Sequence, residues 1–88
     1  WNRVDAPGDG DWIESGYAYF ANSYRVGPDA LDALRRDDWS IATCEYGTEF
    51  VAAVCREGVM ACQFHPELSG AWGLDLLRRW VERTTEWL

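Results

Sequence analysis

The sequence predicts a small domain in which a group of antiparallel strands is followed by a single C-terminal helix. Between residues 40 and 64, short apolar and β-rich runs alternate with glycine-containing turns, a pattern typical of paired strands. After Ser69 the apolar residues instead recur every three or four positions, which is typical of an amphipathic helix. With 88 residues the chain can form at most one domain, and its core is expected to be marginal.

The first part of the sequence predicts a surface loop followed by one strand. Residues 2–15 contain Pro7, two glycines and four acidic residues, a composition that favours turns. The first strand is therefore expected only at residues 17–26, where aromatic and apolar side chains on both faces predict an interior position. Because the chain starts at Trp1 without a methionine, we expect it to be a piece of a longer protein.

A short polar connection and three more strands are expected next. Residues 29–38 are mostly polar, with Leu31 and Leu34 placed to form one helical turn. The run FVAAVC is apolar at every position, which predicts a strand buried on both faces. The expected strands span residues 40–45, 50–56 and 59–64, with turns at Tyr46-Gly47 and Glu57-Gly58.

An amphipathic helix is expected from Ser69 onward. Arginine and glutamate side chains fall mostly on one face of this helix, and apolar side chains fall on the opposite face. Ser69 is a suitable N-cap, because its hydroxyl can accept a hydrogen bond from one of the first unpaired helix amides. The apolar side chains at helical spacing are Leu74, Leu77, Val81 and Leu88, and Leu76 and Trp80 flank them.

Composition excludes several classes of function. The chain carries 8 basic and 15 acidic residues, for a net charge of −7, so nucleic acid or an anionic membrane surface would be repelled. No apolar run approaches the roughly 18 residues needed to span a bilayer, and no leader pattern is present. We therefore expect a soluble, cytoplasmic protein.

The three cysteines predict neither a disulfide framework nor a metal site. Their number is odd, and none of Cys44, Cys55 and Cys62 stands in C-x-x-C spacing. In the expected last hairpin Cys55 faces Met60, so Cys62 is only diagonal to Cys55, which disfavours a disulfide. With one histidine in the chain, a structural zinc ion would lack ligands. Each cysteine is expected to be a small buried packing residue.

The one histidine, His65, lies in the run QFHPE at the expected end of the last strand. Pro66 biases His65 toward extended geometry, in which residues two apart share a side, so Glu67 is expected beside it. A carboxylate that accepts one ring proton leaves the other ring nitrogen to act as a base. The simpler alternative is an exposed, half-solvated histidine. None of the cysteines stands in the glycine-flanked turn of a nucleophile, while Ser69 fits a helix cap and Ser23 lies within an expected strand. The residues alone therefore predict a base without a nucleophile.

Four segments resemble one enzyme family. The string QFHPELSG, followed by a helix rich in leucine and arginine, resembles the end of a class I glutamine amidotransferase domain. With WNRV, YFANSYRV and ATCEYGTEFVAAV, in this order and spacing, it is similar to the glutaminase subunits of imidazole glycerol phosphate synthase. The resemblance implies that residues 1–88 are the C-terminal portion of a flavodoxin-like α/β domain. This portion would supply antiparallel strands, the histidine-bearing strand and the final helix.

The resemblance also implies an activity. His65 and Glu67 would belong to a Cys-His-Glu triad that hydrolyses glutamine to glutamate and ammonia. The cysteine, in a G-x-C-x-G turn, would lie before Trp1 or be missing, so the fragment alone is expected to be inactive. The ammonia would pass to a cyclase subunit of the (β/α)8 barrel type in histidine biosynthesis, forming a heterodimer. No metal or organic cofactor is implied.

Further residues match the family less specifically. Ser23 and Tyr24 match a strand that passes close to bound glutamine, and in the same run Asn22 replaces a common histidine. Trp1 matches a tryptophan near the interface with the cyclase, although it could equally be an exposed chain end. Leu68 replaces a residue that is usually basic, which predicts an altered contact with the partner.

Two alternatives remain open from the sequence. Another class I amidotransferase would share the H-P-E triplet, although WN and YFANSY argue against this. A non-catalytic remnant could instead serve as an interaction module for a barrel-type partner, which would then cover the doubly apolar FVAAVC strand.

Overall fold

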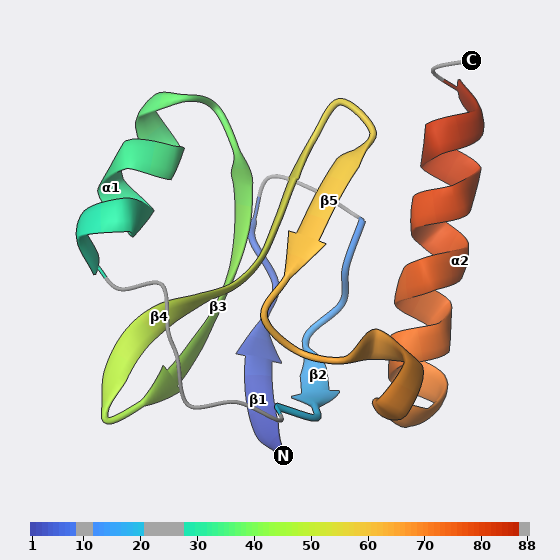
Figure 1. The fold of residues 1–88 in the computed structure, drawn as a ribbon, viewed down its shortest axis with the longest axis horizontal. Helices are drawn as coiled ribbons and strands as arrows, with labels where there is room; N and C mark the ends of the chain where they lie inside the picture. The colour runs from blue at the N-terminus through green and yellow to red at the C-terminus, as the bar shows by residue number, and fades with distance from the viewer. Residues whose placement is uncertain (9–11, 21–27, 87–88) are drawn as a thin grey trace.

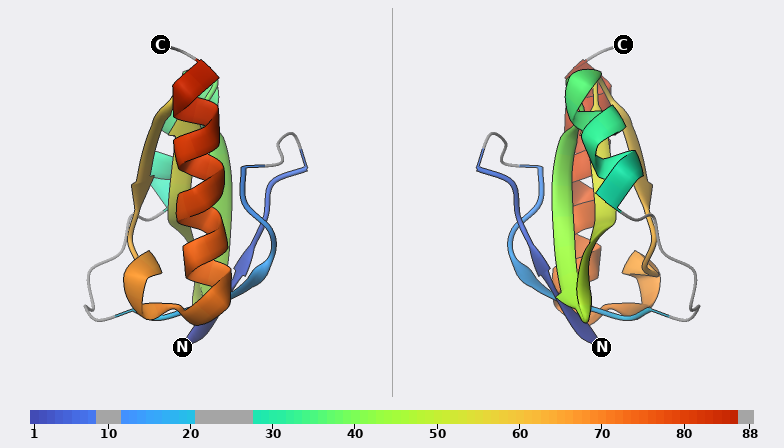
Figure 2. Two further views of the ribbon diagram at one scale, coloured as in Figure 1. Left: turned by 90° about the vertical axis from the view of Figure 1, so that its right-hand side faces the viewer. Right: turned by 90° about the vertical axis from the view of Figure 1, so that its left-hand side faces the viewer.

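The computed structural model describes residues 1–8, 12–20 and 28–86, and its strands form a single sheet with one helix at each end (Figure 1). The two helices lie on opposite sides of the molecule, as the two side views show (Figure 2). The elements are β1 (Asn2–Asp5), β2 (Gly16–Ala18), α1 (Pro28–Arg36), β3 (Ser40–Tyr46), β4 (Thr48–Arg56), β5 (Val59–Cys62), the short 3₁₀ helix η1 (Pro66–Leu68) and α2 (Gly70–Glu86).

The sheet has five strands in the order β2-β1-β3-β4-β5, and each neighbouring pair is antiparallel. The expected antiparallel strands and C-terminal helix are therefore confirmed. The β4–β5 hairpin is also confirmed, with Cys55 paired to Met60 across the turn. Glu57 and Gly58 both have positive φ angles, 53° and 84°, as a two-residue turn matched to the strand twist requires.

The expectation of a surface loop at residues 2–15 is wrong. Asn2–Asp5 forms β1, which lies between β2 and β3, and Val4 in this strand is fully buried. Trp12 and Ile13 also enter the core, and the Trp12 indole donates a hydrogen bond to the Ser40 hydroxyl at 2.7 Å. Local composition gave the wrong prediction, because strand pairing and burial against residues distant in the sequence, rather than local propensity, determine the structure of this segment.

The prediction of an interior strand at residues 17–26 is corrected as well. Within the described residues the strand is β2, only three residues long, and it lies at one edge of the sheet and pairs with β1 alone. Tyr17 is accordingly exposed. Residues 21–26 of the expected strand lie outside the described residues.

Both faces of β4 are covered, which confirms the prediction made from its apolar run. On one face Val51 packs with Leu31 of α1 and Ile41 of β3 in a small cluster. The larger cluster covers the other face, where Phe50 and Ala52 pack with residues from β1, β3 and α2. The helix α1 spans nine residues and is longer than the single turn expected, because its leucines gain this packing surface.

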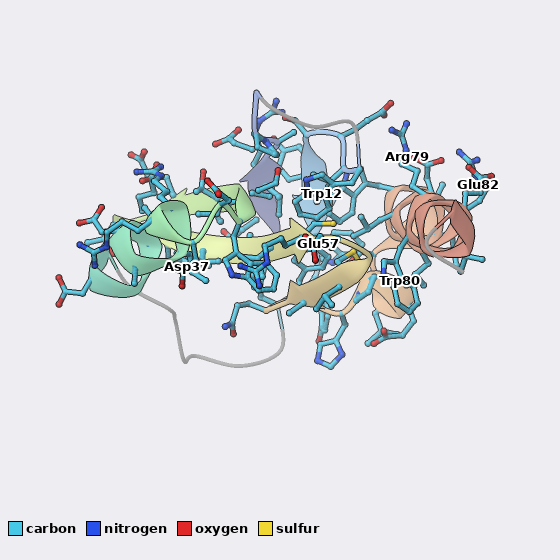
Figure 3. All side chains as sticks on the ribbon, turned by 90° about the horizontal axis from the view of Figure 1, so that it is seen from above. Trp12, Asp37, Glu57, Arg79, Trp80 and Glu82 are labelled. Atoms are coloured by element: carbon cyan, nitrogen blue, oxygen red, sulfur yellow. The ribbon has the colours of Figure 1, made fainter. Side chains whose placement is uncertain are left out.

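Helix α2 packs along the flank of the predicted apolar stripe rather than through its centre. Within that stripe Leu77 is half-buried, and Leu88 lies outside the described residues. Leu76 is buried and Trp72 packs against the main core, whereas Leu74 and Val81 are exposed. The Trp80 indole donates to the Gly58 carbonyl oxygen at 3.0 Å, and Figure 3 shows Trp80 and Glu82 on opposite sides of the helix. Among the described residues, α2 and α1 are both too short or too polar to cross a membrane.

Candidate functional site

His65 and Glu67 form a hydrogen-bonded pair just after the last strand. The pairing of β4 with the chain continues one step past β5, because the amide of Gln63 donates to the Ala52 carbonyl oxygen at 2.8 Å. His65 follows in extended geometry, with φ −99° and ψ 98°, and Pro66 begins η1. The distance from His65 Nδ1 to Glu67 Oε1 is 2.8 Å.

The two residues are neighbours as predicted, but the backbone that joins them is different. The expectation placed both in an extended segment, whereas Glu67 lies in the first turn of η1. The 3₁₀ turn brings the carboxylate back toward the imidazole of the preceding extended residue. Because Pro66 lacks an amide hydrogen and has a fixed φ, it suits the first position of this turn.

The pair is accessible and its carboxylate is stabilised as the anion. The side chains are 43% exposed for His65 and 58% exposed for Glu67. The pKa of Glu67 lies below its usual value, chiefly because its own backbone amide hydrogen-bonds to the carboxylate and also because His65 does. An ionised Glu67 accepts a hydrogen bond from Nδ1–H of His65, which orients the ring and leaves Nε2 with a lone pair that can accept a proton.

Tyr19, the residue that follows β2, lies against His65. Its carbonyl oxygen accepts a hydrogen bond from the His65 amide at 2.9 Å, and the two rings lie 6.4 Å apart. The Trp1 ring also contacts Tyr19, in an edge arrangement with the ring centroids 6.0 Å apart. Trp1 is 64% exposed, and Leu68 in η1 is also exposed. Both residues expected at a partner interface therefore lie on the surface. The Leu68 amide donates to the His65 carbonyl oxygen, and Trp1 contacts Tyr19, which in turn contacts His65.

Two residues expected to bind substrate cannot be placed beside this pair. Ser23 and Tyr24 lie outside the described residues, as does Asn22. Their roles stay predictions. They follow Tyr19 by only a few positions, and Tyr19 is hydrogen-bonded to His65.

The cysteines of the chain offer no activated thiol beside His65. Cys44 and Cys55 are buried, and no disulfide joins any two of the three cysteines. Cys62 is half-buried, and its pKa is raised by burial and by the negative charge of Glu67. A raised pKa reduces the thiolate fraction at neutral pH, so Cys62 is a poor nucleophile. Among the described residues, no three histidine, cysteine or acidic side chains are grouped as metal ligands.

Sequence reasoning missed the way in which Ser69 takes part in this site. Its hydroxyl was expected to cap α2, but it accepts a hydrogen bond from the Tyr19 amide at 2.9 Å and donates one to the His65 carbonyl oxygen at 2.6 Å. The separation of four residues between His65 and Ser69 could have indicated their contact only if the 3₁₀ helix η1 between them had been predicted. Ser69 and Tyr19 are 50 residues apart in the sequence, so no local sequence pattern could indicate their contact.

Comparison with known proteins finds similar imidazole glycerol phosphate synthase sequences. No family model matches the chain. The chain is 44% identical over 87 residues to the imidazole glycerol phosphate synthase subunit HisH of Herpetosiphon aurantiacus, covering 93% of this chain and 38% of that protein. It is 42% identical over 87 residues to subunit HisH of Salmonella typhimurium, covering 93% and 40%. The chloroplastic imidazole glycerol phosphate synthase hisHF of Arabidopsis thaliana is 37% identical over 84 residues, covering 92% and 14%.

These similarities confirm the family resemblance that the four sequence segments predicted. They extend over more than nine-tenths of the chain, so they do not depend on the short motif around His65 alone. The chain spans about 40% of the length of the HisH relatives that it matches. The chain is thus homologous to the C-terminal part of the HisH subunits of imidazole glycerol phosphate synthase.

Proposed function

We propose that this chain is the C-terminal portion of a glutaminase subunit of imidazole glycerol phosphate synthase, and that His65 is its general base. The observation that carries the proposal is the 2.8 Å contact between His65 Nδ1 and Glu67 Oε1 in a chain homologous to HisH. Glu67 orients the ring and fixes its tautomer. The nucleophilic cysteine would come from a part of the protein outside these 88 residues.

The proposed reaction uses Nε2 of His65 as a proton carrier. Nε2 takes the proton of the cysteine thiol, and the thiolate attacks the side-chain amide carbonyl of glutamine. The imidazolium then protonates the departing nitrogen, which leaves as ammonia while a thioester forms. A water molecule, deprotonated by the same Nε2, hydrolyses the thioester to glutamate and returns the thiol. Glu67 stabilises the imidazolium at each step, because its carboxylate is ionised.

The ammonia would be used by a cyclase subunit of the (β/α)8 barrel type. Free ammonia is protonated in neutral water and then loses its nucleophilicity, so a partner docked close to His65 would preserve it. Such a partner would contact the exposed Leu68 in η1 and the exposed Trp1, which lies against Tyr19. The apolar Leu68 predicts an apolar contact at this point rather than an ion pair.

Substitution of His65 tests the proposed role of the ring. In the gene product that contains this chain, His65→Gln should lower the rate of glutamate release by roughly 10²- to 10⁴-fold, the usual contribution of a general acid and base. The rate is measured with the cyclase partner present, by coupled detection of glutamate. Circular dichroism should show that the variant is folded, because the side chain is partly exposed.

Two variants serve as matched controls for this experiment. Cys62→Ser should retain activity within about twofold, because a thiol with a raised pKa is not the nucleophile. Glu82→Gln removes a surface carboxylate far along α2 and should also leave the rate unchanged. Full activity in His65→Gln, or loss of activity in Cys62→Ser with the fold intact, would refute the proposal.

A further inference from the structure

Ser69 is the one polar residue among the buried residues that the structure describes, with only 2% of its surface exposed. It lies between η1 and α2, four residues after His65. Burying a hydroxyl is unfavourable unless it is hydrogen-bonded, and both capacities of this hydroxyl are used. It donates to the His65 carbonyl oxygen at 2.6 Å and accepts from the Tyr19 amide at 2.9 Å.

These hydrogen bonds close a ring through three residues, which we call the Ser69 clamp: Tyr19, His65 and Ser69. The His65 amide donates to the Tyr19 carbonyl oxygen at 2.9 Å, so Tyr19 uses both of its backbone groups within the clamp. His65 is likewise held on both sides, through its amide and its carbonyl oxygen. The carbonyl oxygen also accepts from the Leu68 amide at 3.1 Å, which fixes η1 to the same atom.

The clamp joins segments that the sheet itself does not pair. Tyr19 follows β2 at one edge of the sheet, whereas His65 follows β5 at the other edge. Between Tyr19 and His65 the described contacts are the backbone hydrogen bond and the tilted ring contact. Among the described residues, the hydrogen bonds of the Ser69 clamp therefore bridge the two edges of the sheet.

We propose that Ser69 is a positioning residue for the glutaminase reaction, which fixes the backbone of His65 against the segment that continues from Tyr19. This inference rests on the proposed function of His65. The hydroxyl does not touch the imidazole or the substrate and acts through the His65 carbonyl oxygen. Since a base displaced by about 1 Å can lose roughly 10²-fold in rate, the orientation of this peptide controls the reach of Nε2.

A role as N-cap of α2 does not account for the hydrogen bonds of the Ser69 hydroxyl. Its backbone carbonyl oxygen already accepts the Gly73 amide at 3.1 Å and begins α2, and this bond needs no side chain. The side-chain oxygen is directed at Tyr19 and His65 instead. Loss of the hydroxyl would therefore leave the helix start intact and release the His65 peptide.

The experiment compares Ser69→Ala with Ser69→Thr in the gene product that contains this chain, with glutamine and the cyclase partner. Ser69→Ala should lower kcat by about 10- to 100-fold while the KM for glutamine changes by less than about threefold, because the base moves and the binding groups do not. Ser69→Thr retains a hydroxyl and should recover kcat to within about threefold. Ser69→Cys, which keeps the volume with a weak donor, replaces Ser69→Ala if the alanine variant does not fold.

A destabilised but correctly arranged site is the competing explanation, and Val4→Ala provides the control. Val4 is fully buried in β1, so its truncation lowers stability without touching the clamp, and kcat should stay within about twofold below the unfolding transition. A folded Ser69→Ala or Ser69→Cys variant with kcat within about twofold of the parent overturns the inference. So does a Ser69→Thr variant as slow as Ser69→Ala. If His65→Gln is itself fully active, the proposed function is refuted. This result does not depend on the Ser69 variants, so failure of the proposed function and failure of the Ser69 inference can be told apart.

Discussion

Glu67 is the residue whose ionisation decides whether His65 keeps its partner. Its pKa lies below the ordinary value of 4.5, first because of the hydrogen bond from its own amide and then because of His65. Since the folded pKa is lower than the unfolded one, the ionised carboxylate stabilises the folded chain at pH values above 4.5. This contribution is lost as the pH falls through the folded pKa. The pair should therefore persist in mildly acidic solution.

The hydrogen bond from its own amide lowers the pKa of Glu67 more than His65 does, so removal of the imidazole should raise this pKa only in part. The carboxyl ¹³C shift of Glu67, followed by NMR against pH, should have a midpoint below 4.5. In His65→Gln the midpoint should rise but remain below 4.5, because the amide of Glu67 still donates to the carboxylate. A midpoint that is unchanged by the substitution would show that the imidazole does not hold the carboxylate in solution.

At this scale the sequence predicted which residues meet but not how they are held. The pairing of His65 with Glu67 followed from Pro66 and from a separation of two residues. The bonds that hold the His65 backbone come from Tyr19 and Ser69, and the first of these is 46 residues away. Such a contact depends on how the sheet edges approach each other, and short-range patterns contain no information about that.

At the scale of elements, the first turn of α2 packs directly on η1, and Gly73 makes this possible. A Cβ atom at Gly73 would overlap the carbonyl oxygen of Pro66, the residue between His65 and Glu67. Helix propensity alone favours alanine over glycine by about 1 kcal/mol in a helix. The structure predicts the opposite sign here, because a backbone carbonyl cannot move aside as the end of a side chain can.

Gly73→Ala should therefore destabilise the chain by about 1–3 kcal/mol, the usual cost of forcing extra volume into a packed site. Urea denaturation, followed by tryptophan fluorescence, measures the change in the free energy of unfolding. Gly8→Ala is the control, since a Cβ at Gly8 has no neighbour within 4 Å, and it should change stability by less than about 0.5 kcal/mol. A Gly73→Ala variant as stable as the parent would mean that α2 and η1 are not packed in this way.

The elements themselves divide into those that local pattern determines and those that it does not. The strands β3, β4 and β5 were predictable because their apolar runs and their turns are both local signals. Strand β1 was missed because its four residues include only one apolar side chain, and pairing on both sides rather than composition makes it a strand. The segment after β1 is held by distant partners too, since the Trp72 indole donates to the Glu14 carbonyl oxygen at 2.9 Å.

At the scale of the whole molecule, the described residues leave large apolar side chains exposed on α2. Periodicity placed Leu74 and Val81 in the apolar stripe of this helix, yet they are 62% and 55% exposed. Periodicity located an apolar stripe correctly but could not say which surface covers it. Trp72 and Leu76 pack on the core instead, so α2 carries apolar side chains on two faces. Since the HisH relatives are longer than this chain, we expect the exposed apolar face of α2 to pack against a part of the protein outside these 88 residues.

Leu74→Glu tests this idea, because its expected effect depends on context. In the isolated 88-residue chain the position is exposed, so the free energy of unfolding should change by less than about 0.5 kcal/mol. In the gene product that contains this chain, a covered Leu74 would lose its apolar burial and place a charge in an interface, which costs about 2 kcal/mol or more. Urea denaturation of both proteins measures the two changes, with Glu82→Gln as a surface control in each. Equal, small changes in the free energy of unfolding of both proteins would show that Leu74 stays uncovered. This result would favour the interaction module, and binding of the Leu74→Glu variant to the cyclase would then be measured.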